Sequence, residues 1–153
     1  MQLRTILGAA GLGLGMLGAG PALAEPSQRP AVEVFKSPTC GCCTKWVDHL
    51  SAHGFQVETR DLQNLDELKA SNGVPRPLRS CHTALVDGYV IEGHVPAADV
   101  QRLLRERPRV AGLAVPGMPI GSPGMEGPNP EPYQVWSFGG AEGVVVFSSH
   151  APR

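Results

Sequence analysis

Apolar and polar positions between residues 31 and 106 alternate in short segments that predict strands and helices in turn. Val32–Phe35 is β-branched and partly alternating, which favours a short strand. The next apolar residues recur at i, i+3, i+4 and i+7, the spacing of the buried face of an amphipathic helix: Cys43, Trp46, Val47 and Leu50. Gly54 is a suitable helix terminator, and Phe55–Arg60 predicts a second strand after it.

The pattern continues through a short helix, a hairpin and a longer helix. Leu65–Ser71 has apolar residues at helical spacing, and Pro96–Glu106 predicts a third helix. Between them, Thr83–Val86 and Tyr89–Glu92 flank Asp87-Gly88, a dipeptide typical of two-residue hairpin turns. This order of elements predicts an α/β fold of the thioredoxin-like type, a mixed sheet with helices on its faces. We therefore assign residues 31–106 to one thioredoxin-like domain.

Residues 107–132 differ sharply in composition from the segments before them. Five glycines and seven prolines fall within this stretch, so we expect a long Gly/Pro-rich loop without a regular element. Two apolar segments follow, Val135–Phe138 and Val144–Ser148, joined by a Gly-rich connection. They predict a C-terminal β-hairpin within residues 133–149 that packs on the same domain.

The first 24 residues have the three parts of a secretory signal peptide. A short basic start, Met1–Arg4, precedes the uncharged apolar run Thr5–Gly20, and Ala22-Leu23-Ala24 matches the small-x-small pattern at which signal peptidase cuts. The apolar run is too short and too rich in glycine for a membrane span. We expect cleavage after Ala24, export without stable membrane insertion, and a compartment in which disulfides persist.

The net charge of the chain excludes one class of partner. Thirteen basic and fourteen acidic residues give a formal charge of −1 at pH 7. A nucleic-acid-binding protein needs a basic footprint, so no nucleic-acid partner is expected.

Four cysteines carry most of the chemical information in the sequence. Cys40, Cys42 and Cys43 lie where the first strand gives way to the first helix, and a helix N-terminus favours the reactive thiolate form. Cys81 precedes the hairpin, at the place where a thioredoxin-like fold would bring it opposite the other three. Three interpretations are open: two structural disulfides, a thiol–disulfide exchange pair of Cys40 and Cys43, or a metal site. Clustering of all four thiols favours the metal site.

The spacing of the cysteines favours copper(I) over zinc. A four-thiolate zinc site usually uses two separated pairs, whereas this chain divides its thiols three and one. Copper(I) is soft, accepts two or three thiolates and can be bridged by shared sulfurs. The Pro-Gly-Met repeats of the loop add two thioethers, Met118 and Met125, which are either copper ligands or fillers of gaps in the core.

Histidines provide weaker candidate ligands. His82 is adjacent to Cys81, and His94 lies just before the third helix. His49 and His53 share one helix face, but they lie turns away from the cysteines, and we expect both to be exposed to solvent.

Several long motifs of this chain resemble one known family. The matching segments are Lys36–Cys43 with Trp46, Ser80–Thr83, Gly88–Ala97 and the loop Pro116–Glu126. They resemble the small periplasmic copper-resistance proteins of the CopG type, and the similarity runs from about Val32 to Phe147. The resemblance implies a thioredoxin-like fold, a periplasmic location, and copper binding through the clustered cysteines. It also implies a thiolate-bridged multinuclear copper cluster, redox interconversion of Cu(I) and Cu(II), and a role in copper tolerance.

The leading hypothesis is therefore an exported protein that holds Cu(I) on Cys40, Cys42, Cys43 and Cys81. Its output would be sequestration, transfer or redox handling of copper, with copper ions and other periplasmic copper-handling proteins as partners. A metal-binding protein is favoured over an enzyme, although copper redox activity stays open. The alternatives are a periplasmic thiol–disulfide oxidoreductase that uses Cys40 and Cys43, and a disulfide-stapled interaction domain.

Overall fold

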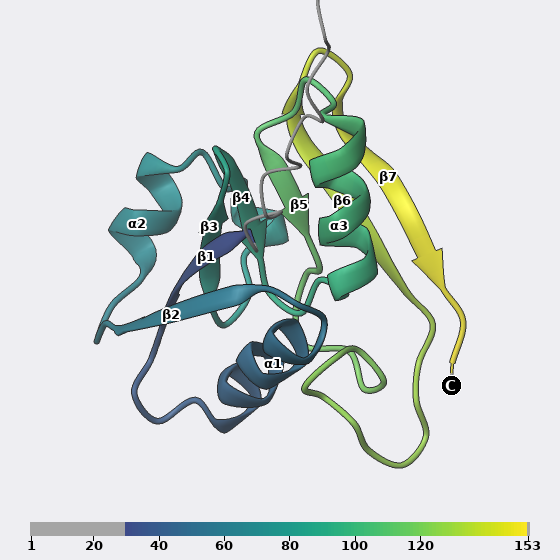
Figure 1. Ribbon diagram of the computed structural model, residues 1–153. Coiled ribbons are helices and arrows are strands. Elements are labelled where there is room, and N and C mark those ends of the chain that lie inside the picture. Colours follow the sequence, from purple (N-terminus) through teal and green to yellow (C-terminus); the bar gives the residue numbers. More distant parts are fainter. Residues whose placement is uncertain (1–29, 153) are drawn as a thin grey trace, which may run out of the picture.

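The computed structural model describes residues 30–152 (Figure 1), so the expected signal peptide lies outside the described residues. The described residues form eleven elements in this order: β1 Ala31–Lys36, α1 Gly41–Ala52, β2 Gln56–Asp61, α2 Asp66–Ser71, the 3₁₀ turn η1 Arg76–Leu78, β3 Thr83–Val86, β4 Tyr89–Glu92, α3 Ala97–Glu106, β5 Gly112–Ala114, β6 Tyr133–Gly140 and β7 Gly143–His150. Within residues 30–152, no helix is long and apolar enough to span a membrane.

The seven strands of residues 30–152 form one sheet in the order β2-β1-β3-β4-β5-β6-β7. The pairs β1–β2 and β4–β5 are parallel, and the other neighbouring strands are antiparallel. The expected mixed α/β class, with flanking helices and a C-terminal strand pair, is confirmed. The Asp87-Gly88 turn is also found as expected, because both residues have the positive φ angles, 48° and 85°, of a two-residue hairpin.

Helices and turns cover both faces of the sheet. On one face, Trp46 and Leu50 of α1 and Val100 and Leu103 of α3 pack into a single apolar core. The indole Nε1–H of Trp46 donates a hydrogen bond to the carbonyl oxygen of Val95, 2.9 Å away, which ties α1 to the segment before α3. This core fixes the N-terminal end of α1 relative to the sheet, and that end bears three of the four cysteines.

The opposite face of the sheet has a smaller core under the segment between α2 and β3. Its members are Val74, Leu78, Val90, Ala114 and Phe138. Leu78 ends the 3₁₀ turn η1, so the turn anchors the chain shortly before Cys81.

One expectation about residues 107–132 is wrong, because the segment contains a strand. β5 pairs in parallel with β4 and antiparallel with β6, and thereby joins the C-terminal hairpin to the rest of the sheet. The Gly/Pro density, averaged over the whole segment, conceals a proline-free apolar stretch between Pro108 and Pro116. Burial of Leu113 and Ala114 between two neighbouring strands supplies the stabilisation that local propensity does not.

Candidate metal centre

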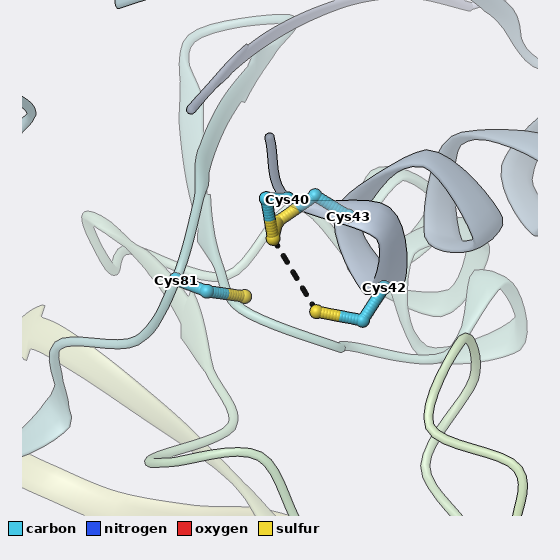
Figure 2. A group of neighbouring side chains, drawn as sticks. All are labelled: Cys40, Cys42, Cys43 and Cys81. Atoms are coloured by element: carbon cyan, nitrogen blue, oxygen red, sulfur yellow. Dashed lines mark hydrogen bonds between the residues drawn. A yellow bond between two sulfur atoms is a disulfide. The ribbon is translucent and has the colours of Figure 1, made fainter. Parts of the chain in front are cut away.

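Three cysteines meet at the N-terminal end of α1 (Figure 2). Cys40 is the N-cap residue, and no side chain caps the first N–H groups of the helix. These N–H groups and the helix dipole favour negative charge, so a thiolate is stabilised at this position. Cys40 and Cys43 form a disulfide, and the sulfur of Cys42 lies 3.3 Å from that of Cys40.

Cys81 approaches this group from the loop before β3, on the other side of the site. Figure 2 shows its side chain pointing toward the three cysteines of α1. The sulfur atoms of all four cysteines lie within 4.8 Å of one another. Two segments separated by almost forty residues therefore bring four sulfurs into the volume of one small cluster.

The redox state differs from that of a four-thiolate site. Cys40 and Cys43 are oxidised to a disulfide, while Cys42 and Cys81 are free thiols. Two structural disulfides would require one cysteine of the α1 group (Cys40, Cys42 and Cys43) to pair with Cys81. The observed pairing within the α1 group does not match that arrangement. A disulfide sulfur is not the thiolate that binds soft metals, so a four-thiolate site requires reduction of this bond first.

Burial and the neighbouring Cys42 raise the pKa of Cys81 to about 11. Without a bound cation, Cys81 is therefore a protonated thiol at neutral pH. Two thiolates so close together would repel each other in a partly buried site, and a cation between them removes that penalty. Metal binding at this position would release the proton.

Two histidines extend the group on the side of Cys81. The Cys81 sulfur lies 3.3 Å from Nδ1 of His82 and 3.1 Å from Nε2 of His94. Burial lowers the pKa of both imidazoles, which keeps them in the neutral form that binds metals. Nε2 of His82 is a buried nitrogen without a hydrogen-bond partner within the described part of the chain. Ligand atoms of Cys81, His82 and His94 form a second group within 4.8 Å.

The Gly/Pro/Met loop folds over the start of α1. Gly124, with a φ of +85°, approaches so closely that an added Cβ would lie 2.7 Å from the carbonyl oxygen of Cys42 and 2.9 Å from the backbone nitrogen of Trp46. A second contact joins the Ser80 hydroxyl to the carbonyl oxygen of Gly117. The loop therefore contacts both segments that carry the cysteines.

The two methionines of this loop are not buried. The Met118 side chain is 50% exposed, and Met125 is half-buried. Met118 therefore does not fill a gap in the core, which was the alternative to a ligand role.

One expectation about the histidines of α1 is wrong. His53 is exposed as expected, but His49 is half-buried, and its Nε2 accepts a hydrogen bond from the Ala97 N–H at the start of α3. Burial lowers the pKa of His49, with a further contribution from His53. His49 follows Trp46 by three residues and therefore flanks the buried stripe of α1. This spacing was the feature of the sequence that could have predicted its partial burial.

Sequence reasoning also missed Lys69 and Glu92. Their side chains form a buried ion pair, with 2.6 Å between Lys69 Nζ and Glu92 Oε1. Nothing in the local pattern distinguishes either residue from an ordinary surface charge.

Comparison with known proteins identifies the family. The family described as "Protein of unknown function, DUF411" matches residues 78–125. Two solved structures of copper resistance protein CopG, described as forms 1 and 2, are each 42% identical to this chain with a TM-score of 0.75. Form 1 covers 81% of this chain and form 2 covers 80%, and each match spans 99% of the solved chain. No curated protein matches the chain. The chain belongs to the family of copper resistance protein CopG.

Proposed function

We propose that this protein is an exported copper-binding protein that holds Cu(I) on Cys40, Cys42, Cys43 and Cys81. The observation that carries the proposal is the convergence of four sulfur atoms within 4.8 Å from two distant segments. Thiolates are soft ligands, and Cu(I) is a soft ion that accepts bridging thiolates. Family membership supports the assignment of copper, and the output would be copper tolerance through sequestration, transfer or redox handling.

Electrostatics favours more than one copper ion in this site. Four thiolates packed into a partly buried site repel one another, and the N-terminal end of α1 offsets only about half an elementary charge. Each Cu(I) ion neutralises one thiolate, so several ions bridged by shared sulfurs remove most of the repulsion. His82 and His94 would complete the coordination on the side of Cys81, and Met118 or Met125 would add a thioether.

Loading of the site would begin with reduction of the Cys40–Cys43 disulfide. A dithiol can supply the two electrons and two protons, and is itself oxidised to a disulfide. The four cysteines then bind Cu(I) as thiolates and release their protons to solvent.

Copper titration of the protein in two redox states tests the proposal. The purified chain is reduced with a dithiol, desalted under argon and titrated with Cu(I) in competition with a chromogenic chelator, beside a sample with the disulfide intact. We expect the reduced sample to retain several copper ions and the oxidised sample to retain fewer. A reduced protein with four reactive thiols that loses all its copper to the chelator would contradict the proposal.

A second candidate function is thiol–disulfide exchange by Cys40 and Cys43. The disulfide between these two residues at a helix N-terminus is the observation that favours it. Cys42 and Cys81 argue against a clean two-thiol cycle, because each is a further thiol within reach of the disulfide. Turnover in an insulin-reduction assay comparable with that of a dedicated oxidoreductase would favour this candidate over copper binding.

We also propose the division of the chain that the sequence indicates. Residues 1–24 would be removed on export to the periplasm, where copper ions and other copper-handling proteins would be the partners. Residues 31–106 would form the metal-binding domain, with the loop 107–132 and the hairpin 133–149 packed on it. The pairing of β5 with both β4 and β6 supports one continuous unit. N-terminal sequencing of the exported protein should begin at Glu25, and a start at Met1 would contradict cleavage.

A further inference from the structure

A buried ion pair lies beneath the loop that carries Cys81. Glu92, the last residue of β4, is fully buried, and Lys69 of α2 is 4% exposed. Thr83 bridges them, since its hydroxyl accepts from Lys69 Nζ at 2.9 Å and donates to Glu92 Oε2 at 2.7 Å. Lys69 is the only residue of α2 that is buried. This short helix is therefore attached to the sheet mainly through a charged group.

Glu92 also holds the backbone next to Cys81. Its Oε1 atom accepts a hydrogen bond from the Ser80 N–H at 2.6 Å. On the other side of Cys81, the Gly93 N–H donates to the carbonyl oxygen of His82 at 3.0 Å. The end of β4 therefore fixes the backbone on both sides of the one cysteine that does not belong to the α1 group.

Stability alone does not account for this ion pair. Two charges taken out of water lose hydration, and apolar replacement of a buried pair is often neutral or stabilising. Lys69 and Thr83 each donate one hydrogen bond to the Glu92 carboxylate, and a third bond joins Lys69 to Thr83. These bonds hold the carboxylate where it accepts from the Ser80 N–H. The outer contact of this loop, from the Ser80 hydroxyl to Gly117, is exposed to solvent, whereas the Glu92 carboxylate is not.

We propose that Glu92, oriented by Lys69 and Thr83, is a positioning residue that fixes the Ser80–His82 segment and thereby holds the Cys81 sulfur against the cysteines of α1. The expected effect of Glu92 on copper binding rests on the proposed function, but its effect on the position of the Cys81 sulfur does not. Glu92 touches no sulfur, so its effect must pass through the Ser80 N–H.

A matched pair of variants separates positioning from folding. Both carry Lys69→Met and Thr83→Val, which remove the cation and the bridging hydroxyl. One adds Glu92→Gln, which keeps a side-chain oxygen for the Ser80 N–H, and the other adds Glu92→Met, which has similar volume but no acceptor. Because neither variant leaves a buried charge, we expect both to fold, with thermal midpoints within a few degrees of each other.

The first measurement uses no metal. In the protein with the Cys40–Cys43 disulfide intact, diamide converts the free thiols of Cys42 and Cys81 into a disulfide and is reduced to the hydrazine. Mass spectrometry follows the rate. We expect the Met variant to react about tenfold or more slowly than the wild type, since misplacement of reacting atoms by an ångström is costly. The Gln variant keeps the acceptor for the Ser80 N–H but lacks the groups that orient it, so its rate should fall between those of the wild type and the Met variant. Equal rates in the Gln and Met variants would overturn the proposal.

The second measurement is retention of Cu(I) by the reduced proteins against a chelator. We expect the Met variant to lose about tenfold in affinity, because a misplaced ligand weakens a metal site. The Gln variant should lose less, because it keeps an acceptor for the Ser80 N–H. If diamide coupling slows in the Met variant while copper retention is equal, positioning stands and Cys81 is not a ligand. If the wild type retains no copper, the proposed function fails and the diamide rates still decide the inference.

Amide hydrogen exchange keeps the inference testable if the Met variant does not fold. In the wild type, the Ser80 N–H should exchange as slowly as the amides of β3 and β4, because its acceptor is buried. Exchange of Ser80 at the rate of an exposed loop amide would show that Glu92 does not hold it, and would overturn the proposal.

Discussion

His94 presents its Nε2 atom to the sulfur of Cys81 at 3.1 Å, with the ring fixed from behind. Its Nδ1 atom lies 2.7 Å from the carbonyl oxygen of Pro123, which can only accept, so Nδ1 carries the proton. The lone pair of Nε2 therefore faces the sulfur. A second hydrogen bond that sets the tautomer and the orientation of the ring is typical of metal-ligating histidines.

This orientation predicts a ligand role for His94. In His94→Asn, the amide nitrogen replaces the Nδ1 donor, and nothing replaces Nε2. We expect Cu(I) affinity to fall about tenfold or more. The metal-free protein should lose some stability but stay folded, because the smaller side chain leaves a cavity at this buried position. His53→Asn, at the exposed C-cap of α1, is the control and should retain copper as the wild type does. If His94→Asn retained Cu(I) as well as the wild type does, Nε2 of His94 would contact the Cys81 thiol without being a copper ligand.

Stability of the metal-free protein should depend on pH through its buried histidines. Burial lowers the pKa of His49, His82 and His94 below the ordinary 6.5 in the folded state. The unfolded chain therefore binds more protons below pH 6.5, and the free energy of unfolding decreases as pH falls from 6.5.

Urea unfolding between pH 7.5 and pH 5 measures this dependence. In His49→Gln the decrease should be shallower, because one of the three groups no longer titrates. His53→Gln, at the exposed C-cap of α1, removes only the smaller contribution of His53 to the lowered pKa of His49, so it should change the pH dependence less than His49→Gln does. An identical pH dependence in His49→Gln and the wild type would contradict the contribution of His49.

The sequence pattern predicted correctly those elements that depend on interactions between residues close together in the chain. The i, i+3, i+4, i+7 stripe of α1 and the Asp87-Gly88 turn depend on neighbours in sequence, and both were found where expected. β5 depends on pairing with β4 and β6, which are remote in the chain, so composition alone misjudged it. The burial of Lys69 and Glu92 likewise exists only after α2 packs on the sheet.

The cysteine group shows the same division. The helix N-terminus beneath Cys40 could be predicted from the apolar stripe, and the approach of Cys81 from the order of the elements. The pairing of Cys40 with Cys43 could not be predicted, because three thiols within four residues offer several pairings and spacing does not rank them.

Replacement of Cys81 tests whether the site closes from the opposite loop. Cys81→Ser removes one of four sulfurs and leaves the α1 group intact. We expect copper affinity and stoichiometry to fall about as much as in Cys42→Ser, the other free thiol, because each contributes one bridging thiolate. Unchanged stoichiometry and affinity in Cys81→Ser would show that the three cysteines of α1 bind copper alone.

Gly124 tests the contact of the loop with α1. In Gly124→Ala, both the positive φ and the contact with the Cys42 carbonyl oxygen oppose the added methyl group. Gly143, at the start of β7, has a φ of +76° and no atom within 4 Å of an added Cβ, so Gly143→Ala isolates the backbone strain. We expect Gly143→Ala to lose about 1 kcal/mol of stability and Gly124→Ala about 2–4 kcal/mol, with weaker Cu(I) retention only in Gly124→Ala. Equal losses of stability and of Cu(I) retention in the two variants would contradict a functional contact between the loop and α1.

The methionines of the loop provide the last test. Met118 and Met125 lie on a segment that contacts both cysteine-bearing segments, and Met118 is too exposed to be a core residue. Replacing both with Leu preserves volume and apolar character but removes sulfur. If a thioether binds copper, Met118→Leu/Met125→Leu should release Cu(I) to a competing chelator at lower chelator concentration, while the thermal midpoint of the metal-free protein stays within a few degrees of the wild type. The single variants identify which sulfur is responsible. Equal retention in the double variant would exclude both thioethers as ligands and leave binding to the cysteines and histidines, because side chains that only cover the site can be replaced by leucine without loss.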